Sequence, residues 1–291
     1  MKIIKYFFEF IIIISLFGIF KIIGLKNASN LGSILGKIIG PYFRSQSIIK
    51  KNIKIALGDI KKKKEEEIIN GMWSNIGRTF AEYIFLKNFK LNKAGFDHIK
   101  ITGIEYLDEI KKSNEPVVFF SGHFANFELM AMELNKFGIK LAAIYRPLNN
   151  IFLNPFMEHL RTNYICPIQI PKGKSGSREM VKKIREGYSI ALMVDQRVSE
   201  GPRISFFNKE ALTTTIPSQI ALKYNCKIVP IHIERKNGIN FEMVIHKPYE
   251  INKTKAHEED IKNNSLKVNQ YIEKMIVKNS SQWIWTHDRW K

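Results

Sequence analysis

Cysteine is scarce in this chain of 291 residues, and the two that occur, Cys166 and Cys226, are isolated from each other. They show no spacing typical of a zinc site or a redox motif, and they give no support for an oxidising compartment. The sequence also lacks a P-loop, a GxGxxG motif, a metal-ligand set of His, Cys, Asp and Glu, and a carboxylate pair of the glycosidase type. These absences argue against a metalloenzyme, a dinucleotide-binding protein and a glycosidase.

Acidic residues are few: 27 stand against 46 lysines and arginines, which gives a net charge of +19. Such a charge favours an acidic partner, which is nucleic acid, an anionic membrane surface or an acidic substrate. The basic residues are not interleaved with aromatic residues as in a nucleic-acid-binding module, so nucleic acid is not the expected partner. Lysine, isoleucine and asparagine are abundant throughout, and part of the charge reflects this general composition.

Residues 1–24 are the most apolar segment of the chain. A membrane-spanning helix needs about 20 mainly apolar residues, whereas the run over residues 6–20 is shorter and contains Glu9. No cleavage pattern of small residues follows it, so we expect an uncleaved N-terminal membrane anchor that spans the bilayer or lies in its interface. A buried helix of a soluble fold is the alternative. Basic residues flank both ends and leave the orientation open.

Residues 25–94 are expected to form a helical, membrane-proximal region whose lysines suit anionic headgroups. From residue 95 onward, short apolar runs alternate with helical segments. The runs that predict strands are residues 99–102, 117–120, 141–145, 165–170, 189–194, 227–233 and 241–246. This alternation predicts an α/β catalytic domain over residues 95–291, with a largely parallel central sheet flanked by helices.

His123 lies where one of these strands gives way to a helix. A Ser-Gly break ends the run at 117–120, His123 follows at once, and residues 127–134 favour a helix. Glu128 comes five residues later, about 140° away on a continuous helix, so the two side chains meet only if His123 lies in the turn. A carboxylate there would hold the imidazole tautomer, and the free ring nitrogen can accept a hydroxyl proton. The ordinary alternative is a structural histidine.

Polar residues also follow two other predicted strands. Arg146 comes directly after residues 141–145, and Asp195 and Gln196 follow the strand at 189–194. Ligands of open α/β sheets bind outside the carboxyl ends of the strands, so these side chains line one cleft with His123 if the strands are neighbours. Arg146 can bind a phosphate or an oxyanion, and Asp195 can orient Arg146 or an acceptor sugar. A surface arginine and a turn aspartate are the alternatives.

The segment Gly-His-Phe-Ala-Asn-Phe-Glu at residues 122–128 resembles the His-x4-Glu box of the late acyltransferases of lipid A biosynthesis, the lauroyl and myristoyl transferase family. This family belongs to the wider glycerolipid-acyltransferase-like group, whose usual box has Asp in place of Glu. Ala125 and Phe127 stand where the family most often has Gly and Trp, whereas His123, Asn126 and Glu128 are retained.

Further segments resemble the same family in the same order along the chain. They are Tyr-Arg-Pro at 145–147, Asp-Gln at 195–196, the loop that begins at 201 and the tryptophan-rich tail at 282–291. In the loop, Asn208 stands where the family usually has Gly, and we expect the turn to be kept because Asn tolerates positive φ. The tail is expected to dock on the core or at the membrane interface.

The resemblance implies a membrane-bound O-acyltransferase of the bacterial inner membrane, with its catalytic domain on the cytoplasmic side. The implied donor is an acyl-carrier-protein thioester, the implied acceptor is a lipid A precursor, and no metal or organic cofactor is implied. In the implied mechanism Glu128 orients His123, which takes a proton from a 3-hydroxyl of a hydroxyacyl chain. The residues expected to bind substrate are Asn126, Arg146, Asp195 and Gln196. The carrier protein, the lipid A phosphates and the inner leaflet are all acidic, which suits the basic chain.

Two other functions remain. A glycerolipid (lysophospholipid) acyltransferase would use the same box, although the glutamate in the box and the tryptophan-rich tail weigh against it. The second alternative is a non-catalytic basic protein that binds membranes. Acceptor competition distinguishes the first alternative, and an activity that depends on His123 excludes the second.

Overall fold

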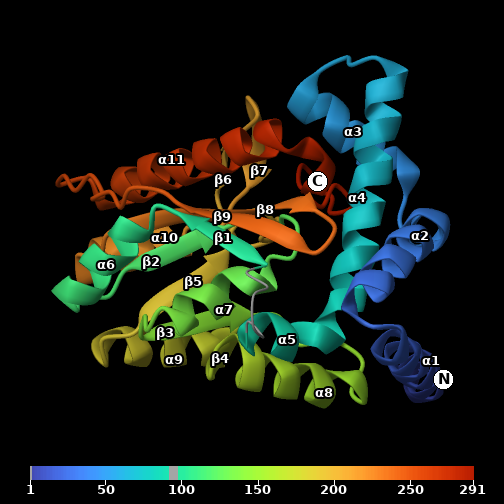
Figure 1. Ribbon diagram of the computed structural model, residues 1–291. Coiled ribbons are helices and arrows are strands. Elements are labelled where there is room, and N and C mark those ends of the chain that lie inside the picture. The colour runs from blue at the N-terminus through green and yellow to red at the C-terminus, as the bar shows by residue number, and fades with distance from the viewer. Residues whose placement is uncertain (1, 92–97) are drawn as a thin grey trace.

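A seven-stranded sheet forms the centre of the computed structural model, which describes residues 2–91 and 98–291 (Figure 1). The strand order is β1-β9-β8-β2-β5-β3-β4, and every neighbouring pair is parallel except β8 and β9. The strands are β1 Ile99–Thr102, β2 Val118–Ser121, β3 Leu141–Tyr145, β4 Ile168–Pro171, β5 Ser189–Met193, β8 Ile228–Asn237 and β9 Asn240–Ile245. The predicted fold class, a largely parallel sheet flanked by helices, is confirmed.

The central strands are buried on both faces, which is why their sequences are continuously apolar. In β2, Phe119 packs into one core, while Val118 and Phe120 pack into the other on the opposite face. The first core is covered by α6 Ile104–Ser113, α7 Glu128–Lys136, α8 Leu153–Leu160 and the π-helical turn η2 Arg161–Ile165. The second is covered by α9 Lys174–Arg185, α10 Ile216–Tyr224 and α11 His257–Lys278.

The loop that begins at residue 201 contains a hairpin that the sequence did not predict. Strands β6 Arg203–Phe206 and β7 Lys209–Leu212 pair in antiparallel fashion, with Phe206 opposite Lys209. The two residues between them, Phe207 and Asn208, have φ of 52° and 55°. Positive φ at both positions is typical of a type I′ turn. The expected tolerance of Asn208 for positive φ is confirmed.

The N-terminal region is helical, as expected for residues 25–94 as far as the structure describes them. Its elements are α1 Lys2–Ile23, α2 Leu25–Phe43, α3 Gln46–Leu57, α4 Lys62–Glu82, the short turn η1 Tyr83–Phe85 and α5 Leu86–Leu91. The expected boundary between residues 94 and 95 lies outside the described residues. Helix α4 links this region to the rest of the protein, because it packs against both α2 and the C-terminal tail (Figure 1).

Helices α2 and α4 approach each other closely at glycines. A Cβ built on Gly77 would lie 2.0 Å from the carbonyl oxygen of Gly32, and one built on Gly36 would lie 2.2 Å from that of Trp73. Real side chains do not approach a backbone oxygen so closely, so the helices would have to separate. The contact therefore requires residues without a side chain.

Replacing Gly77 with alanine is expected to lower the free energy of unfolding by about 1–3 kcal/mol, the usual cost of overpacking. Thermal unfolding of the purified protein measures the change. Gly18→Ala is the matched control in helix α1, because a Cβ there would meet no atom within 4 Å. Equal stability of Gly77→Ala and the wild type would contradict the close approach of α2 and α4.

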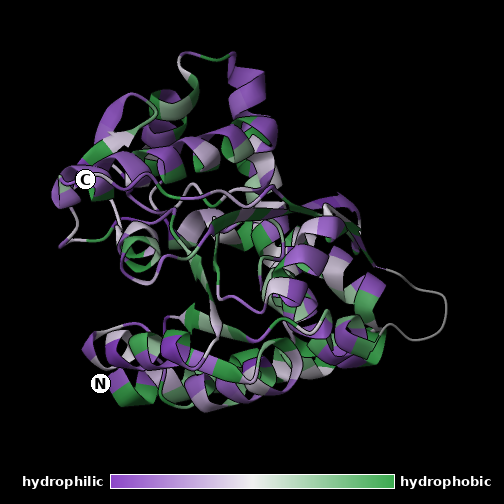
Figure 2. Ribbon diagram, turned by 90° about the vertical axis from the view of Figure 1, so that its left-hand side faces the viewer, coloured by the Kyte–Doolittle hydropathy of each residue, from purple (hydrophilic) through white to green (hydrophobic). Residues whose placement is uncertain are grey.

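Helix α1 has one apolar face against the protein and another exposed. Phe17 and Phe20 are buried in the first core, with the Phe17 ring 5.0 Å from that of Phe80 on α4. The side chains on the outer face are large and apolar: Ile3, Ile4, Phe7, Phe8, Ile11, Ile12, Ile19 and Ile22. In Figure 2 the helical layer beside the N-terminus shows hydrophobic stretches that alternate with hydrophilic ones. By length and composition alone, α1 could cross a membrane.

Candidate active site

His123 and Asp195 meet because of the sheet order. Strands β2 and β5 are parallel neighbours, and Ser121 on β2 is paired with Met193 on β5. Each functional residue lies two positions beyond this pair, so the two leave the sheet side by side at its carboxyl edge. The Nδ1 atom of His123 lies 2.8 Å from Oδ1 of Asp195.

The carboxylate of Asp195 is buried and has three donors. The backbone N–H of His123 donates to Oδ2 at 2.9 Å, the indole N–H of Trp283 donates to the same atom at 2.8 Å, and the His123 ring binds Oδ1. Burial alone would raise the pKa of Asp195, but the charge and hydrogen bonds of His123 and the bond from Trp283 lower its pKa to about 2. Asp195 is therefore ionised and acts only as an acceptor.

An ionised Asp195 fixes the tautomer of His123. Nδ1 must carry the hydrogen that is donated to the carboxylate, which leaves the lone pair on Nε2. Burial alone would lower the pKa of His123, but Asp195, with a smaller contribution from Glu128, raises it above the ordinary value. The side chain is 20% exposed. His123 is thus a base whose orientation and basicity are set by Asp195.

Glu128 lies at the first position of α7, but it does not hold His123 in the way expected. Its Oε1 atom accepts hydrogen bonds from Nη2 of Arg161 at 2.8 Å and from the hydroxyl of Tyr83 at 2.8 Å. Asp195, and not Glu128, is the carboxylate that binds Nδ1 of His123, so a catalytic role of Glu128 stays a prediction. Glu128 instead orients the guanidinium of Arg161, which the same ion pair keeps protonated.

The turn that carries His123 is fastened to helix α4. Ala125 has φ of 45°, a strained value that suits the glycine more usual here, and its carbonyl accepts hydrogen bonds from Asn75 and Thr79. Asn126 is fully buried and donates to Oε2 of Glu82 at 3.0 Å.

The same Glu82 carboxylate forms a salt bridge with Arg235 of β8 and accepts a hydrogen bond from Ser29 of α2. The amide nitrogen of Asn126 is used in this network and Asn126 does not line the cavity described below, so its role in binding substrate stays a prediction. The network connects the helical N-terminal region to the catalytic turn.

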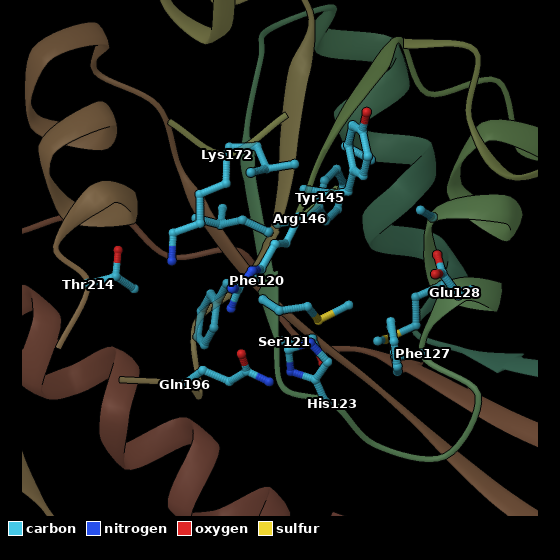
Figure 3. Close-up of a pocket in the computed structure, with 18 of the residues that line it drawn as sticks. Phe120, Ser121, His123, Phe127, Glu128, Tyr145, Arg146, Lys172, Gln196 and Thr214 are labelled. Atoms are coloured by element: carbon cyan, nitrogen blue, oxygen red, sulfur yellow. The ribbon is translucent and has the colours of Figure 1, made fainter. Parts of the chain in front are cut away.

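A cavity of about 270 Å³ opens beside His123 (Figure 3). Its apolar part is formed by side chains of the sheet and of α7 and η2: Phe119, Phe127, Met130, Ala131, Ala143, Ile165, Ala191, Met193 and Ile231. Its polar part carries His123, Glu128, Arg146, Arg161, Lys172, Gln196, Arg197, Thr214 and His287. An apolar pocket with a few convergent polar groups, one of them a perturbed base, is typical of an active site.

The whole chain, residues 1–291, matches the sequence family described as bacterial lipid A biosynthesis acyltransferase. The chain belongs to this family. It is 25% identical over 259 residues to a lipid A biosynthesis acyltransferase of Haemophilus influenzae, over 85% of this chain and 78% of that protein. It is also similar to the lipid A biosynthesis lauroyltransferase of Escherichia coli, with 21% identity over 271 residues, 90% of this chain and 84% of that one.

A third relative is the lipid A biosynthesis palmitoleoyltransferase of Escherichia coli, 22% identical over 269 residues, again 90% of this chain and 84% of that one. The resemblance drawn from the His123 box and the later segments is therefore confirmed. The protein is an acyltransferase that acts in lipid A biosynthesis, and its family implies a lipid A precursor as substrate.

Within this lipid A acyltransferase, two of the expected substrate-binding residues line the cavity and two do not. Arg146 and Gln196 lie in its wall, where their role in binding stays a prediction. Asp195 is 2% exposed and its carboxylate binds His123 and Trp283 rather than Arg146, so its expected contact with substrate stays a prediction. Asn126, as described above, is bonded to Glu82.

Arg161 and Trp283 are among the residues of the acyltransferase site that were not predicted from the sequence. Arg161 lies in the π-helical turn η2, with no motif around it, and only the fold brings it to Glu128. Trp283 was expected only to help dock the tail, and its hydrogen bond to Asp195 was not foreseen. The tail docks on the core rather than at a membrane interface, because Trp283, Trp285 and Trp290 are all buried. Its His287, which we expected to be structural, lines the cavity and accepts a hydrogen bond from the backbone N–H of Arg197 at 2.9 Å.

Proposed function

We propose that this enzyme transfers a fatty acyl chain from an acyl-carrier-protein thioester to a 3-hydroxyl of a hydroxyacyl chain on a lipid A precursor. The observation that carries the proposal is the His123–Asp195 pair, whose imidazole lines a cavity with one apolar part and one polar part. The lone pair on Nε2 supplies the base, and the apolar part accommodates hydrocarbon. Acyl transfer from a thioester to a hydroxyl requires no metal ion and no organic cofactor.

In the proposed reaction, Nε2 of His123 takes the proton of the acceptor hydroxyl as its oxygen attacks the thioester carbonyl. A carbon–oxygen bond forms, the carbon–sulfur bond breaks, and the proton passes from the imidazolium to the departing thiolate. Negative charge develops on the carbonyl oxygen in between, and a preorganised donor there lowers the barrier. Nη1 of Arg161 is suited to this, because it is buried beside the cavity without a hydrogen-bond partner among the described residues.

Glu128 then serves as a positioning residue for Arg161. Replacing Glu128 with glutamine is expected to reduce acyl transfer while leaving residual activity, because Arg161 loses a charged partner but His123 keeps Asp195. The acid limb of the pH–rate profile should move only slightly, since Glu128 contributes least to the raised pKa of His123. Steady-state rates between pH 5 and 9 measure both effects.

Asp195→Asn is the comparison for Glu128→Gln, because only Asp195 binds the His123 ring. If Glu128→Gln moves the acid limb as far as Asp195→Asn does, Glu128 and not Asp195 controls the base. An unchanged rate in Glu128→Gln would show that the ion pair between Glu128 and Arg161 does not contribute to the reaction.

We further propose that residues 1–24 anchor the enzyme to the cytoplasmic side of the bacterial inner membrane, next to the membrane-proximal helices of residues 25–94. The catalytic domain, residues 95–291, would then face an anionic leaflet. Contacts at both ends of α1 support an anchor that lies along the surface. The side-chain amide of Asn150 donates to the carbonyl of Tyr6 at 2.8 Å. The ring centroids of Phe17 and of Phe156 on α8 are 6.0 Å apart.

Ile4, Phe8 and Ile12 are exposed apolar residues on successive turns of α1, and replacing all three with serine is expected to weaken membrane binding. Each buried aliphatic or aromatic side chain contributes about 1.5–3 kcal/mol of transfer free energy. Sedimentation with anionic phospholipid vesicles should therefore show the triple variant mostly in the supernatant. This variant leaves Phe17 and Phe20 in the core, which deletion of residues 1–24 would not.

The control removes exposed apolar residues elsewhere, by placing serine at Ile104 and Val277. It should sediment with the vesicles as the wild type does. Retention of the α1 triple variant on the vesicles would show that another surface anchors the enzyme.

Acceptor competition tests the proposed function. The purified full-length enzyme receives one acyl-carrier-protein donor together with a lipid A precursor and a lysophospholipid. We expect acylated lipid A precursor as the product. Acylation of the lysophospholipid alone would assign the site to glycerolipid synthesis and contradict the proposal.

A further inference from the structure

The polar end of the cavity carries more positive than negative charge. Four cationic side chains line it, Arg146, Arg161, Lys172 and Arg197, against the single carboxylate of Glu128. Glu128 is committed to Arg161. The other three cations form no ion pair with any carboxylate in the described part of the chain. An anion from outside the chain would complete this set.

The sheet brings two of these cations together in register. Strands β3 and β4 are parallel neighbours in which Tyr145 is paired with Pro171, and Arg146 and Lys172 each follow directly. The backbone N–H of Lys172 donates to the carbonyl of Tyr145 at 2.8 Å, which keeps the two strand ends together. Figure 3 shows both side chains reaching into the cavity on the side of Thr214 and Gln196, away from Glu128.

Arg197 completes the group from the loop that follows β5, the other neighbour of β3. Its backbone is held by His287, and its Nε atom is buried without a hydrogen-bond partner among the described residues. Burying a guanidinium N–H without an acceptor is unfavourable, and an anionic ligand in the cavity would supply the missing acceptor. A phosphate offers several charged oxygens to arginine and lysine donors at once.

We propose that Arg146, Lys172 and Arg197 form a phosphate subsite at the polar end of the cavity, holding a phosphate ester carried by one of the two substrates. The inference rests on the proposed function for its two candidate sources. One is a sugar phosphate of the lipid A precursor, and the other is the phosphodiester of the pantetheine arm of the acyl carrier protein. In either case the subsite fixes the distance between a phosphate and the reacting atoms at His123.

The test measures binding rather than turnover, in full-length protein carrying His123→Ala. Two ligand pairs are titrated: the lipid A precursor with and without its phosphates, and acyl-4′-phosphopantetheine with acyl-pantetheine. Adding Arg146→Gln and Lys172→Gln should raise the Kd of the phosphorylated member of one pair roughly 10- to 100-fold, the loss expected for one or two charge-assisted hydrogen bonds. The Kd of its unphosphorylated partner should not change. Lys209→Gln, an exposed charge on β7 outside the cavity, is the control.

A selective loss for the phosphorylated lipid assigns the subsite to the acceptor, and a selective loss for the phosphopantetheine assigns it to the donor. Equal losses for both members of a pair, or no loss in either pair, would overturn the proposal. Failure of the wild type to transfer acyl groups would contradict the proposed function instead, because the binding measurement needs no turnover.

Discussion

Replacing His123 with alanine is expected to lower the rate of acyl transfer by roughly 10²–10⁴-fold, the contribution typical of a well-placed general base. The reason is chemical, because among the described residues that line the cavity only His123 has an imidazole that a carboxylate holds through a hydrogen bond, with the lone pair on Nε2 left free. The side chain is partly exposed and belongs to a turn fixed by its backbone, so its loss should leave the fold intact. Single-turnover rates, with circular dichroism as the check on folding, measure both.

His257→Ala is the control, since His257 is exposed at the start of α11 and lies outside the cavity. Its rate should equal that of the wild type. A folded His123→Ala variant that turns over at the wild-type rate would remove the base from the mechanism and favour a site that acts by binding alone.

Asp195→Asn is expected to reduce transfer by as much as ~10⁴-fold, the loss seen when an aspartate that orients a catalytic histidine is made an asparagine. The asparagine amide can present N–H instead of oxygen to Nδ1 of His123. The ring would then turn to the tautomer with hydrogen on Nε2, which cannot accept the hydroxyl proton. The shape of the side chain is nearly unchanged, so the loss would reflect the tautomer and the charge.

The pH–rate profile is expected to shift in a defined direction when Asp195 is replaced. Transfer requires a neutral imidazole, and the folded protein holds the pKa of His123 above 6.5, mainly through Asp195 once the opposing effect of burial is overcome. The wild-type rate should therefore rise with pH through a value above 6.5. In Asp195→Asn the residual activity should rise at lower pH, because the charge that raised the pKa is gone. An acid limb at the same pH in both proteins would show that Asp195 does not control the base.

Much of the fold could be predicted because the strands are buried on both faces. A segment such as residues 189–194 is continuously apolar for that reason, and it is found as β5 Ser189–Met193. The hairpin of β6 and β7 could not be predicted, because its strands are only four residues each and Phe207 is an unusual residue at positive φ.

The position of His123 and of Arg146 followed from the rule that ligands bind beyond the carboxyl ends of strands. The same rule, applied to the strand at 165–170, would also have found Lys172. The pairing of His123 with Asp195 could not be predicted, because it depends on β5 lying next to β2 in the sheet, 72 residues away along the chain.

Glu128 illustrates the limit of spacing arguments. Five residues from His123, it lies close enough to raise the pKa of the imidazole, and sequence spacing alone cannot show which neighbour its carboxylate binds. The Glu128 carboxylate binds Tyr83 in η1 and Arg161 in η2. Both elements are short turns that no sequence motif marks. Strongly patterned segments are therefore predictable, whereas contacts between irregular turns come from the tertiary structure.

The most direct test of the account is the mass of the lipid product. Wild type and His123→Ala would each be given a lipid A precursor and acyl carrier protein loaded with a mixture of fatty acyl chains. The account predicts that the wild-type product gains the mass of one acyl chain, placed by fragmentation on a 3-hydroxyl of a hydroxyacyl chain, and that His123→Ala gives almost none. A precursor that gains no mass with the wild type, or gains it equally with His123→Ala, would contradict it.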